Sequence, residues 1–267
     1  MSPITEEPGL GTEEIYLGGG VLDSHDGDQD RVVTGLGPLK SSSQLVVKQK
    51  VQTCEILTGC EQENRFTITG AGEEILYWAK EHSGFCDRFW CGNVRSFDMT
   101  VTDQTNREVM RLYRPLTCQG CCCSALYPHC TQALTVAVDG QTVGTIRERA
   151  TWLNPVYHVF DSVGNQVRFY SCSDKYLSDF LICLQLLKIR GPACHINLCG
   201  DVEFRVLDVE GGERGRIAKK WMGCFRETLT DADNFVIDFN DGLSTDTKVL
   251  IVAATFLIDM MYFEMNN

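Results

Sequence analysis

The sequence predicts a mainly β fold, a barrel or sandwich of consecutive hairpins, with a helix near the C-terminus. Two observations predict the strands. From Leu45 onward, β-branched and aromatic runs alternate with short Gly, Asp or Asn segments, which is the pattern of hairpins. Runs such as Thr135-Val136-Ala137-Val138 alternate polar and apolar residues, which gives a strand one solvated face. A third observation, the apolar segment 249–263, predicts the helix.

The first 44 residues are expected to be a disordered acidic leader, followed by a barrel domain over 45–267. The leader contains Gly18-Gly19-Gly20 and Ser41-Ser42-Ser43 and lacks a sustained apolar period. Its eight acidic and two basic side chains supply half of the chain's net charge of −12. Because nucleic-acid binding needs a dominant positive field, nucleic acid is an unlikely main ligand.

Five hairpins are predicted in the barrel domain. Each pairs two β-rich runs across a turn that is rich in Gly, Asp or Asn. The pairs are 66–69 with 75–78, 97–101 with 109–113, 134–138 with 143–146, 157–160 with 167–170, and 204–207 with 216–218. So many consecutive hairpins indicate a barrel or a sandwich.

The strands also suggest two related halves. The segment Arg111–Pro115, followed by Cys118, resembles Lys188–Pro192, followed by Cys194. A hairpin and a basic strand that ends in tryptophan come after each. A duplicated set of strands that closes into one barrel is the favoured interpretation, because closure removes exposed edges. Chance similarity among generic hairpins is the alternative.

The C-terminal segment 248–264 is expected to be a helix buried inside the barrel. Its apolar run, 249–263, would span about 22 Å as a helix, whereas crossing a membrane takes about 20 apolar residues and roughly 30 Å. The alternative is a membrane span, for which Asp259 would be costly. The residues assigned to this core or membrane helix are Val249, Ile251, Phe256, Leu257, Asp259 and Phe263.

A cluster of cysteines is the most unusual feature of the sequence. Cys118, Cys121, Cys122 and Cys123 lie within six residues, and the chain's first ten residues lack a signal-peptide pattern. A crowd of thiols in a reducing compartment favours reversible S-acylation at these four residues. The alternatives are a structural cysteine-rich loop and a metal site, although Cys118 and Cys121 have no second pair at zinc-site spacing.

The sequence contains no catalytic motif, and the chain is not expected to be an enzyme. Its five histidines form no motif with a cysteine or carboxylate at catalytic spacing. Phosphate-binding, metalloprotease and nucleophile-elbow motifs do not occur.

Four segments occur together in an order that resembles the phospholipid scramblase family, over a match from about Leu45 to Glu264. They are the cysteine run 118–130, Cys199–Phe204, Thr230–Phe235, and Phe256–Asp259 before Phe263-Glu264. The resemblance implies a Tubby-like fold, a twelve-stranded barrel around a C-terminal helix. It also implies palmitoylation of the cysteine cluster and calcium-responsive movement of phospholipids. The cysteine run is less dense than the family's, since Ser124 and Ala125 follow it, and the family's proline-rich N-terminal arm is missing.

Calcium is assigned in this family to the segment that matches Asp231–Gly242. The segment supplies hard oxygen ligands, with Asp231, Asp233, Asp238 and Asp241 as the candidates. It fails as an EF-hand because it lacks the central glycine and the final glutamate, so weak calcium binding is expected. The alternative is a barrel strand with an acidic rim.

The resemblance also maps a nuclear import signal onto Gly215–Trp221, with Arg216, Lys219 and Lys220. Three basic residues in a strand are a weak signal and more often form a solvated strand face. The strands Arg147–Arg149 and Arg216–Lys220 could instead contact a membrane surface.

Two functions follow from the sequence. The first is a calcium-responsive, ATP-independent scramblase that moves phospholipids in both directions between leaflets. The second is a palmitoyl-anchored adaptor that binds lipids or proteins without translocation. A soluble cytosolic domain without a membrane role is a third alternative. The expected partners are phospholipid membranes with anionic lipids, protein partners and further copies of the chain. The expected location is the cytoplasmic face of the plasma membrane, with a nuclear pool of unacylated protein.

Overall fold

A computed structural model describes residues 35–50, 64–82, 96–115, 132–149, 151, 154–162, 185–192, 201–220 and 234–263. The strands are β1 (Gln44–Gln49), β2 (Arg65–Gly70), β3 (Ile75–His82), β4 (Phe97–Thr102), β5 (Glu108–Arg114), β6 (Ala133–Val138), β7 (Gln141–Arg149), β8 (Val156–Asp161), β9 (Gln185–Arg190), β10 (Val202–Leu207), β11 (Glu213–Lys219) and β12 (Asn234–Phe239). The helices are α1 (Gly37–Ser41), α7 (Thr245–Ile258) and the π-helix η3 (Asp259–Phe263).

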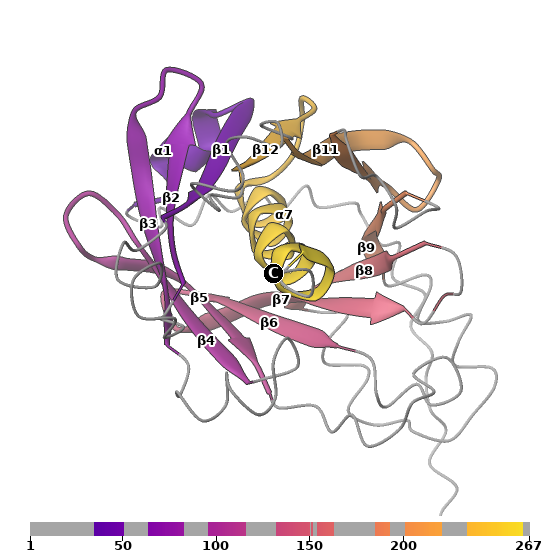
Figure 1. Cartoon of the computed structure of the whole chain (residues 1–267), viewed down its shortest axis with the longest axis horizontal. Helices are drawn as coiled ribbons and strands as arrows, with labels where there is room; N and C mark the ends of the chain where they lie inside the picture. The colour runs from indigo at the N-terminus through magenta and orange to yellow at the C-terminus, as the bar shows by residue number, and fades with distance from the viewer. Residues whose placement is uncertain are drawn as a thin grey trace, which may run out of the picture. The chain divides into compact units, whose positions relative to one another are not determined.

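The twelve strands form one closed antiparallel barrel, as predicted. Each strand pairs with its neighbours in sequence, and β1 pairs with β12 to close the ring. Figure 1 shows this ring with α7 inside it. Closure gives every strand two hydrogen-bonded neighbours, so the sheet has no exposed edge.

Helix α7 forms the centre of the hydrophobic core, which confirms the buried-helix interpretation. Every residue from Thr247 to Ile258 is buried. The inward side chains of the strands pack around it, so an all-round apolar helix finds apolar contacts on every face. In the described part of the chain, no helix is long and apolar enough to cross a membrane.

The helix begins three residues earlier than the expected start at Lys248. The hydroxyl of Ser244 accepts a hydrogen bond from the backbone N–H of Thr247, which is an N-cap. Asp246 in the first turn also favours this start, because the N-terminus of a helix attracts negative charge. The last turn widens into η3 from Asp259 to Phe263.

Four of the five predicted hairpins are confirmed: β2–β3, β4–β5, β6–β7 and β10–β11. In the turn between β6 and β7, Asp139 and Gly140 both have positive φ, 48° and 73°. Two-residue hairpin turns need this backbone geometry, and it explains the Asp-Gly pair.

The fifth predicted hairpin is wrong. Strand β8 pairs with β7 on one side and with β9 on the other, so Val167–Tyr170 is not its partner. Those residues lie outside the described part of the chain. The prediction took the local turn signal at Gly164-Asn165 as the connection to the next strand, whereas the chain continues to β9 before it pairs with β8.

The repeated motifs do not divide the barrel into halves. The segment Arg111–Pro115 lies on β5 and Lys188–Pro192 on β9, four strands apart in a ring of twelve. Related halves would place them six strands apart. The similarity therefore reflects a recurring strand–loop–hairpin pattern rather than a twofold division.

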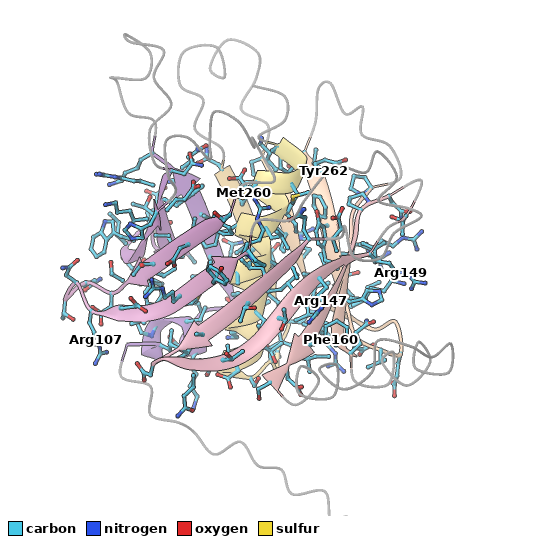
Figure 2. The ribbon with its side chains drawn as sticks, turned by 90° about the horizontal axis from the view of Figure 1, so that it is seen from below. Arg107, Arg147, Arg149, Phe160, Met260 and Tyr262 are labelled. Atoms are coloured by element: carbon cyan, nitrogen blue, oxygen red, sulfur yellow. The ribbon has the colours of Figure 1, made fainter. Side chains whose placement is uncertain are left out.

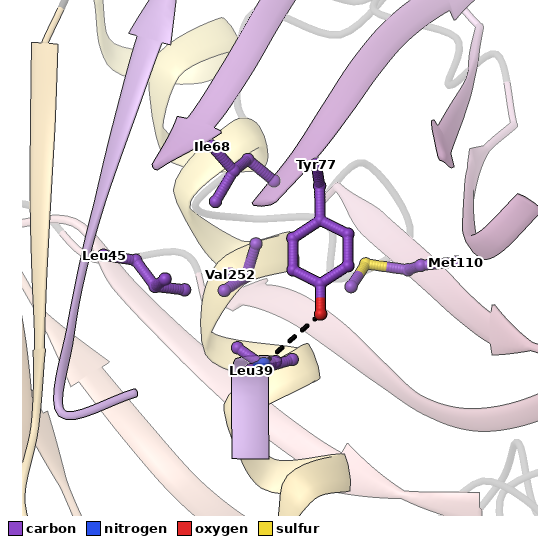
Figure 3. Close-up of a pocket in the computed structure, with 6 residues that line it drawn as sticks. All are labelled: Leu39, Leu45, Ile68, Tyr77, Met110 and Val252. Carbon is purple, nitrogen blue, oxygen red and sulfur yellow. Dashed lines mark hydrogen bonds between the residues drawn. The ribbon is translucent and has the colours of Figure 1, made fainter. Parts of the chain in front are cut away.

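Part of the expected leader is ordered, since α1 closes the end of the barrel where α7 begins. Leu36 and Leu39 are buried in the core. The Tyr77 hydroxyl accepts a hydrogen bond from the Leu39 N–H and donates one to the Gly35 carbonyl. Figure 3 shows Leu39 and Tyr77 lining a small apolar pocket against Val252 of α7. The absence of a helical period in so short a segment explains why the sequence suggested disorder.

Candidate functional site

The two ends of the barrel differ, and several of the segments that the sequence analysis selected join the barrel at the same end. We call the end where η3 lies the exit end and the opposite end the turn end. In Figure 2 Met260 and Tyr262 lie toward one end of the barrel and Arg107, in a tight turn, lies toward the other. Because the strands alternate in direction, the exit end receives the ends of odd-numbered strands and the starts of even-numbered ones.

The four candidate acylation residues, Cys118, Cys121, Cys122 and Cys123, lie outside the described part of the chain. The strands that flank them are described. Strand β5 ends at Arg114 and β6 begins at Ala133, both at the exit end. The cysteine segment is therefore anchored to the exit end at both sides, and its acylation stays a prediction.

The structure describes two of the four candidate calcium ligands, Asp238 and Asp241. Asp231 and Asp233 lie outside the described residues, and Asn234, the first described residue after them, lies at the exit end. Asp238 and Asp241 lie toward the turn end; Asp238 is the fourth residue after Asn234 on β12, about 13 Å along the strand. Calcium ligands must lie within about 2.6 Å of the ion, and a calcium site formed by these residues stays a prediction.

Asp238 is already engaged in the barrel wall. Its two carboxylate oxygens accept hydrogen bonds of 2.6 Å from Gln44 Nε2 and Arg216 Nε. Burial disfavours the ionised carboxylate, but these two hydrogen bonds outweigh it and hold the pKa of Asp238 below its ordinary value. Within the described residues, no group of three or more His, Cys, Asp or Glu side chains could hold a metal ion.

The three candidate basic residues of β11 and its end do not form one patch. Arg216 faces outward and pairs with Asp238 and, at 3.8 Å, with Glu203. Lys220 pairs with Asp201 at 2.6 Å. Lys219 faces the barrel interior, where its Nζ lies 4.0 Å from the ring centroid of Phe263. Strand alternation therefore splits the predicted signal between two faces.

The helix residues chosen from the sequence do lie together. Val249, Ile251, Phe256, Leu257 and Asp259 are buried, and Phe263 is half-buried at the exit end. The ring of Phe263 packs edge-on against Tyr262 and against Phe204 and Phe235 of the wall. This aromatic cluster, with the ammonium of Lys219 above it, fixes η3 in the mouth of the barrel.

Sequence reasoning missed a buried polar group beside this aromatic cluster. Arg114 is fully buried, and its Nη1 donates a hydrogen bond of 3.2 Å to the Met261 sulfur. Burial raises the pKa of Glu148, although the Gln132 backbone N–H and the charge of Arg114 oppose the shift. Burial also raises the pKa of Tyr157. A signal for this group was present in the sequence. Leu112 and Ile146 face inward, and because side chains alternate along a strand, Arg114 and Glu148 two residues later face inward as well.

Comparison with known proteins gives a consistent result. A family model described as Scramblase matches residues 29–265. The chain is 34% identical over 232 residues to phospholipid scramblase 1 of Homo sapiens, covering 86% of this chain and 66% of that protein. It is 33% identical to phospholipid scramblase 2 of Bos taurus, covering 87% and 72%, and 30% identical to phospholipid scramblase family member 5 of Homo sapiens, covering 86% and 77%. The chain thus spans slightly less than two thirds of the length of the first of these relatives.

Proposed function

Because this chain belongs to the phospholipid scramblase family, we propose that it moves phospholipids between the two leaflets of a membrane. The movement is bidirectional, independent of ATP and responsive to calcium. It makes and breaks no covalent bond, so the protein needs no catalytic residues.

The observation that carries the proposal is the asymmetry of the barrel. The strand ends that flank the cysteine segment, the start of β12 after Asp231 and Asp233, and the end of the central helix all meet at the exit end. Two or more acyl chains on Cys118, Cys121, Cys122 and Cys123 would hold this end at a bilayer. Half-buried Tyr262 and Phe263 with Lys219 are residue types that suit a membrane–water interface.

Calcium acts in this proposal through Asp231 and Asp233 at the exit end, with weak affinity. Two carboxylates without a closed cage bind calcium in the range of about 10⁻⁴–10⁻³ M. Anionic lipid headgroups at the same surface would supply further oxygen ligands. Calcium would thus strengthen the contact between the exit end and the membrane.

The second candidate function is a palmitoyl-anchored adaptor that binds lipids or protein partners without moving lipid. The burial of α7 favours it, since the apolar surface of this helix is already used by the core. A path for polar headgroups would then require several copies of the chain or a thinned bilayer. Both candidates place the protein at the cytoplasmic face of the plasma membrane, with unacylated protein free to enter the nucleus.

Reconstitution separates the two functions. The acylated protein is incorporated in vesicles whose inner leaflet carries a fluorescent phospholipid, and loss of fluorescence to an external quencher is followed with and without calcium. Scramblase activity predicts faster loss with calcium and a weaker calcium response after Asp231→Ala and Asp233→Ala. Bound protein that leaves the lipid distribution unchanged at every calcium concentration would support the adaptor.

A further inference from the structure

Two neighbouring rows of basic side chains cover the outward face of β7, β8 and β9. Tyr157 and Ile189 face the core and are buried. Because side chains alternate along a strand, the residues beside them face outward. The strand register places Arg147, His158 and Lys188 in one row and Arg149, Val156 and Arg190 in the next. We call Arg147, Arg149, His158, Lys188 and Arg190 the basic wall.

Three cations of the basic wall, on neighbouring strands, lack the compensating acids with which many other surface cations pair. Six other surface cations among the described residues pair with carboxylates within 3.4 Å: Arg107, Arg111, Arg205, Arg214, Arg216 and Lys220. Over the described residues, no ion pair joins Arg149, Lys188 or Arg190 to an acid. On β10, Arg205 lies opposite Arg190 and already pairs with Glu213.

Like charges on adjacent strands destabilise a sheet, so this arrangement has a cost. The pKa of His158 is consistent with repulsion among these cations. Burial, and then the charges of Arg149 and Lys188, lower the pKa of His158 to about 4. In a chain of net charge −12, the three unpaired cations Arg149, Lys188 and Arg190 on adjacent strands indicate an anionic ligand.

The basic wall also borders the exit end. Arg149 and Arg190 are the last residues of β7 and β9, and both are exposed. Arg147 lies directly opposite Ala133, the first residue of β6, the strand that follows the cysteine segment in the chain. An acyl chain on that segment would bring Arg147 and Arg149 close to lipid headgroups. Nucleic acid has no such tether and is repelled at long range by the net negative charge.

We propose that the basic wall binds the anionic headgroups of a bilayer and orients the barrel on the membrane. The inference rests on the proposed function only for the acyl tether that brings the exit end to the bilayer. The interaction itself is electrostatic and falls off within a Debye length, about 8–10 Å at physiological salt. It therefore operates without acylation, calcium or lipid movement.

The test uses the full chain without acyl groups, in the absence of calcium, and measures sedimentation with vesicles. The vesicles consist of phosphatidylcholine alone or with phosphatidylserine. The parent should bind the anionic vesicles preferentially, and added salt should reduce the binding. The variant Arg149→Gln/Lys188→Gln/Arg190→Gln should bind more weakly, by about fivefold per residue and on the order of 100-fold in total.

The matched control is Arg107→Gln/Arg111→Gln/Arg214→Gln, which changes the net charge equally but removes paired cations. It should bind nearly as the parent does. Circular dichroism checks that the variants fold. If the triple variant does not fold, the double variant Arg149→Gln/Arg190→Gln, which changes two exposed positions, replaces it in the test.

Three results would overturn the proposal: a parent without preference for anionic vesicles, equal losses in the variant and the control, or binding to single-stranded RNA but not to vesicles. None of them depends on lipid translocation. A failed translocation assay alone would count against the proposed function and leave the basic wall intact.

Discussion

At the scale of single residues, Lys248 shows how one buried cation can join two elements. Its ammonium donates hydrogen bonds of 2.7 Å to the carbonyls of Lys40 and Ser42, at the end of α1. It also lies 5.3 Å from the ring centroid of Phe239. Burial lowers the pKa of Lys248, and the charge of Asp241 opposes the shift. The ammonium thus satisfies carbonyls that the short helix leaves open.

Replacing Lys248 with methionine should destabilise the fold by about 1–3 kcal/mol, because the part-buried carbonyls of Lys40 and Ser42 lose their donor. Lys220→Met, which removes an exposed cation paired with Asp201, should cost under about 1 kcal/mol. Urea unfolding followed by circular dichroism compares the two. Equal midpoints for both variants would show that the contact with α1 contributes nothing.

His158 makes the stability of the protein depend on pH. Its pKa falls from an ordinary value of 6.5 to about 4 in the folded state, so the unfolded chain binds more protons between these values. Stability contributed by this residue is therefore present above pH 6.5 and is lost as the pH falls toward 4. His158→Gln should reduce the difference in urea midpoint between pH 7.5 and pH 5. An unchanged difference would contradict this assignment. Glu148, whose pKa is raised, makes stability increase as the pH falls, and it does so equally in the parent and in His158→Gln.

At the scale of elements, the fit of α7 against β7 depends on Gly144. A Cβ at this position would meet the Phe160 carbonyl oxygen and lie 2.9 Å from a methyl group of Leu250 on α7. The wall has no room for it, because the oxygen belongs to the backbone of the neighbouring strand β8. The sequence alone gives no reason for a glycine in this strand.

We expect Gly144→Ala to destabilise the protein by about 1–3 kcal/mol through overpacking. Gly37→Ala is the control, since a Cβ there would have no atom within 4 Å. Thermal unfolding of both variants tests the expectation. An unchanged melting temperature for Gly144→Ala would mean that α7 and β7 can move apart without a loss of stability.

At the scale of the whole molecule, we propose that an acyl tether on the cysteine segment decides how the barrel meets a membrane. Replacing Cys118, Cys121, Cys122 and Cys123 with alanine should move the protein from membranes to the soluble fraction. The loss should be graded, because one acyl chain binds only marginally and two or more bind stably. Fractionation of cells that express single, double and quadruple variants measures it, with Cys194→Ala as control. Unchanged membrane association of the quadruple variant would exclude acylation as the tether.

The sequence by itself determined four of the hairpins and the central helix, in their order along the chain. Period-two alternation and turn residues such as Asp139-Gly140 predicted four hairpins, because these signals act between neighbours along the chain. The length and apolar character of 249–263 predicted a buried helix, and the observed burial of α7 agrees. The family resemblance supplied the number of strands, which local patterns did not.

Only the tertiary structure decided which residues act together. Asp238, the fourth residue after Asn234 on β12, lies toward the turn end and is bound by Gln44 and Arg216 from the two neighbouring strands. Strand alternation turned Lys219 inward, and pairing brought Lys188 and Arg190 beside Arg149. Such relations depend on register and closure, which join residues far apart in the chain and leave no local pattern in the sequence.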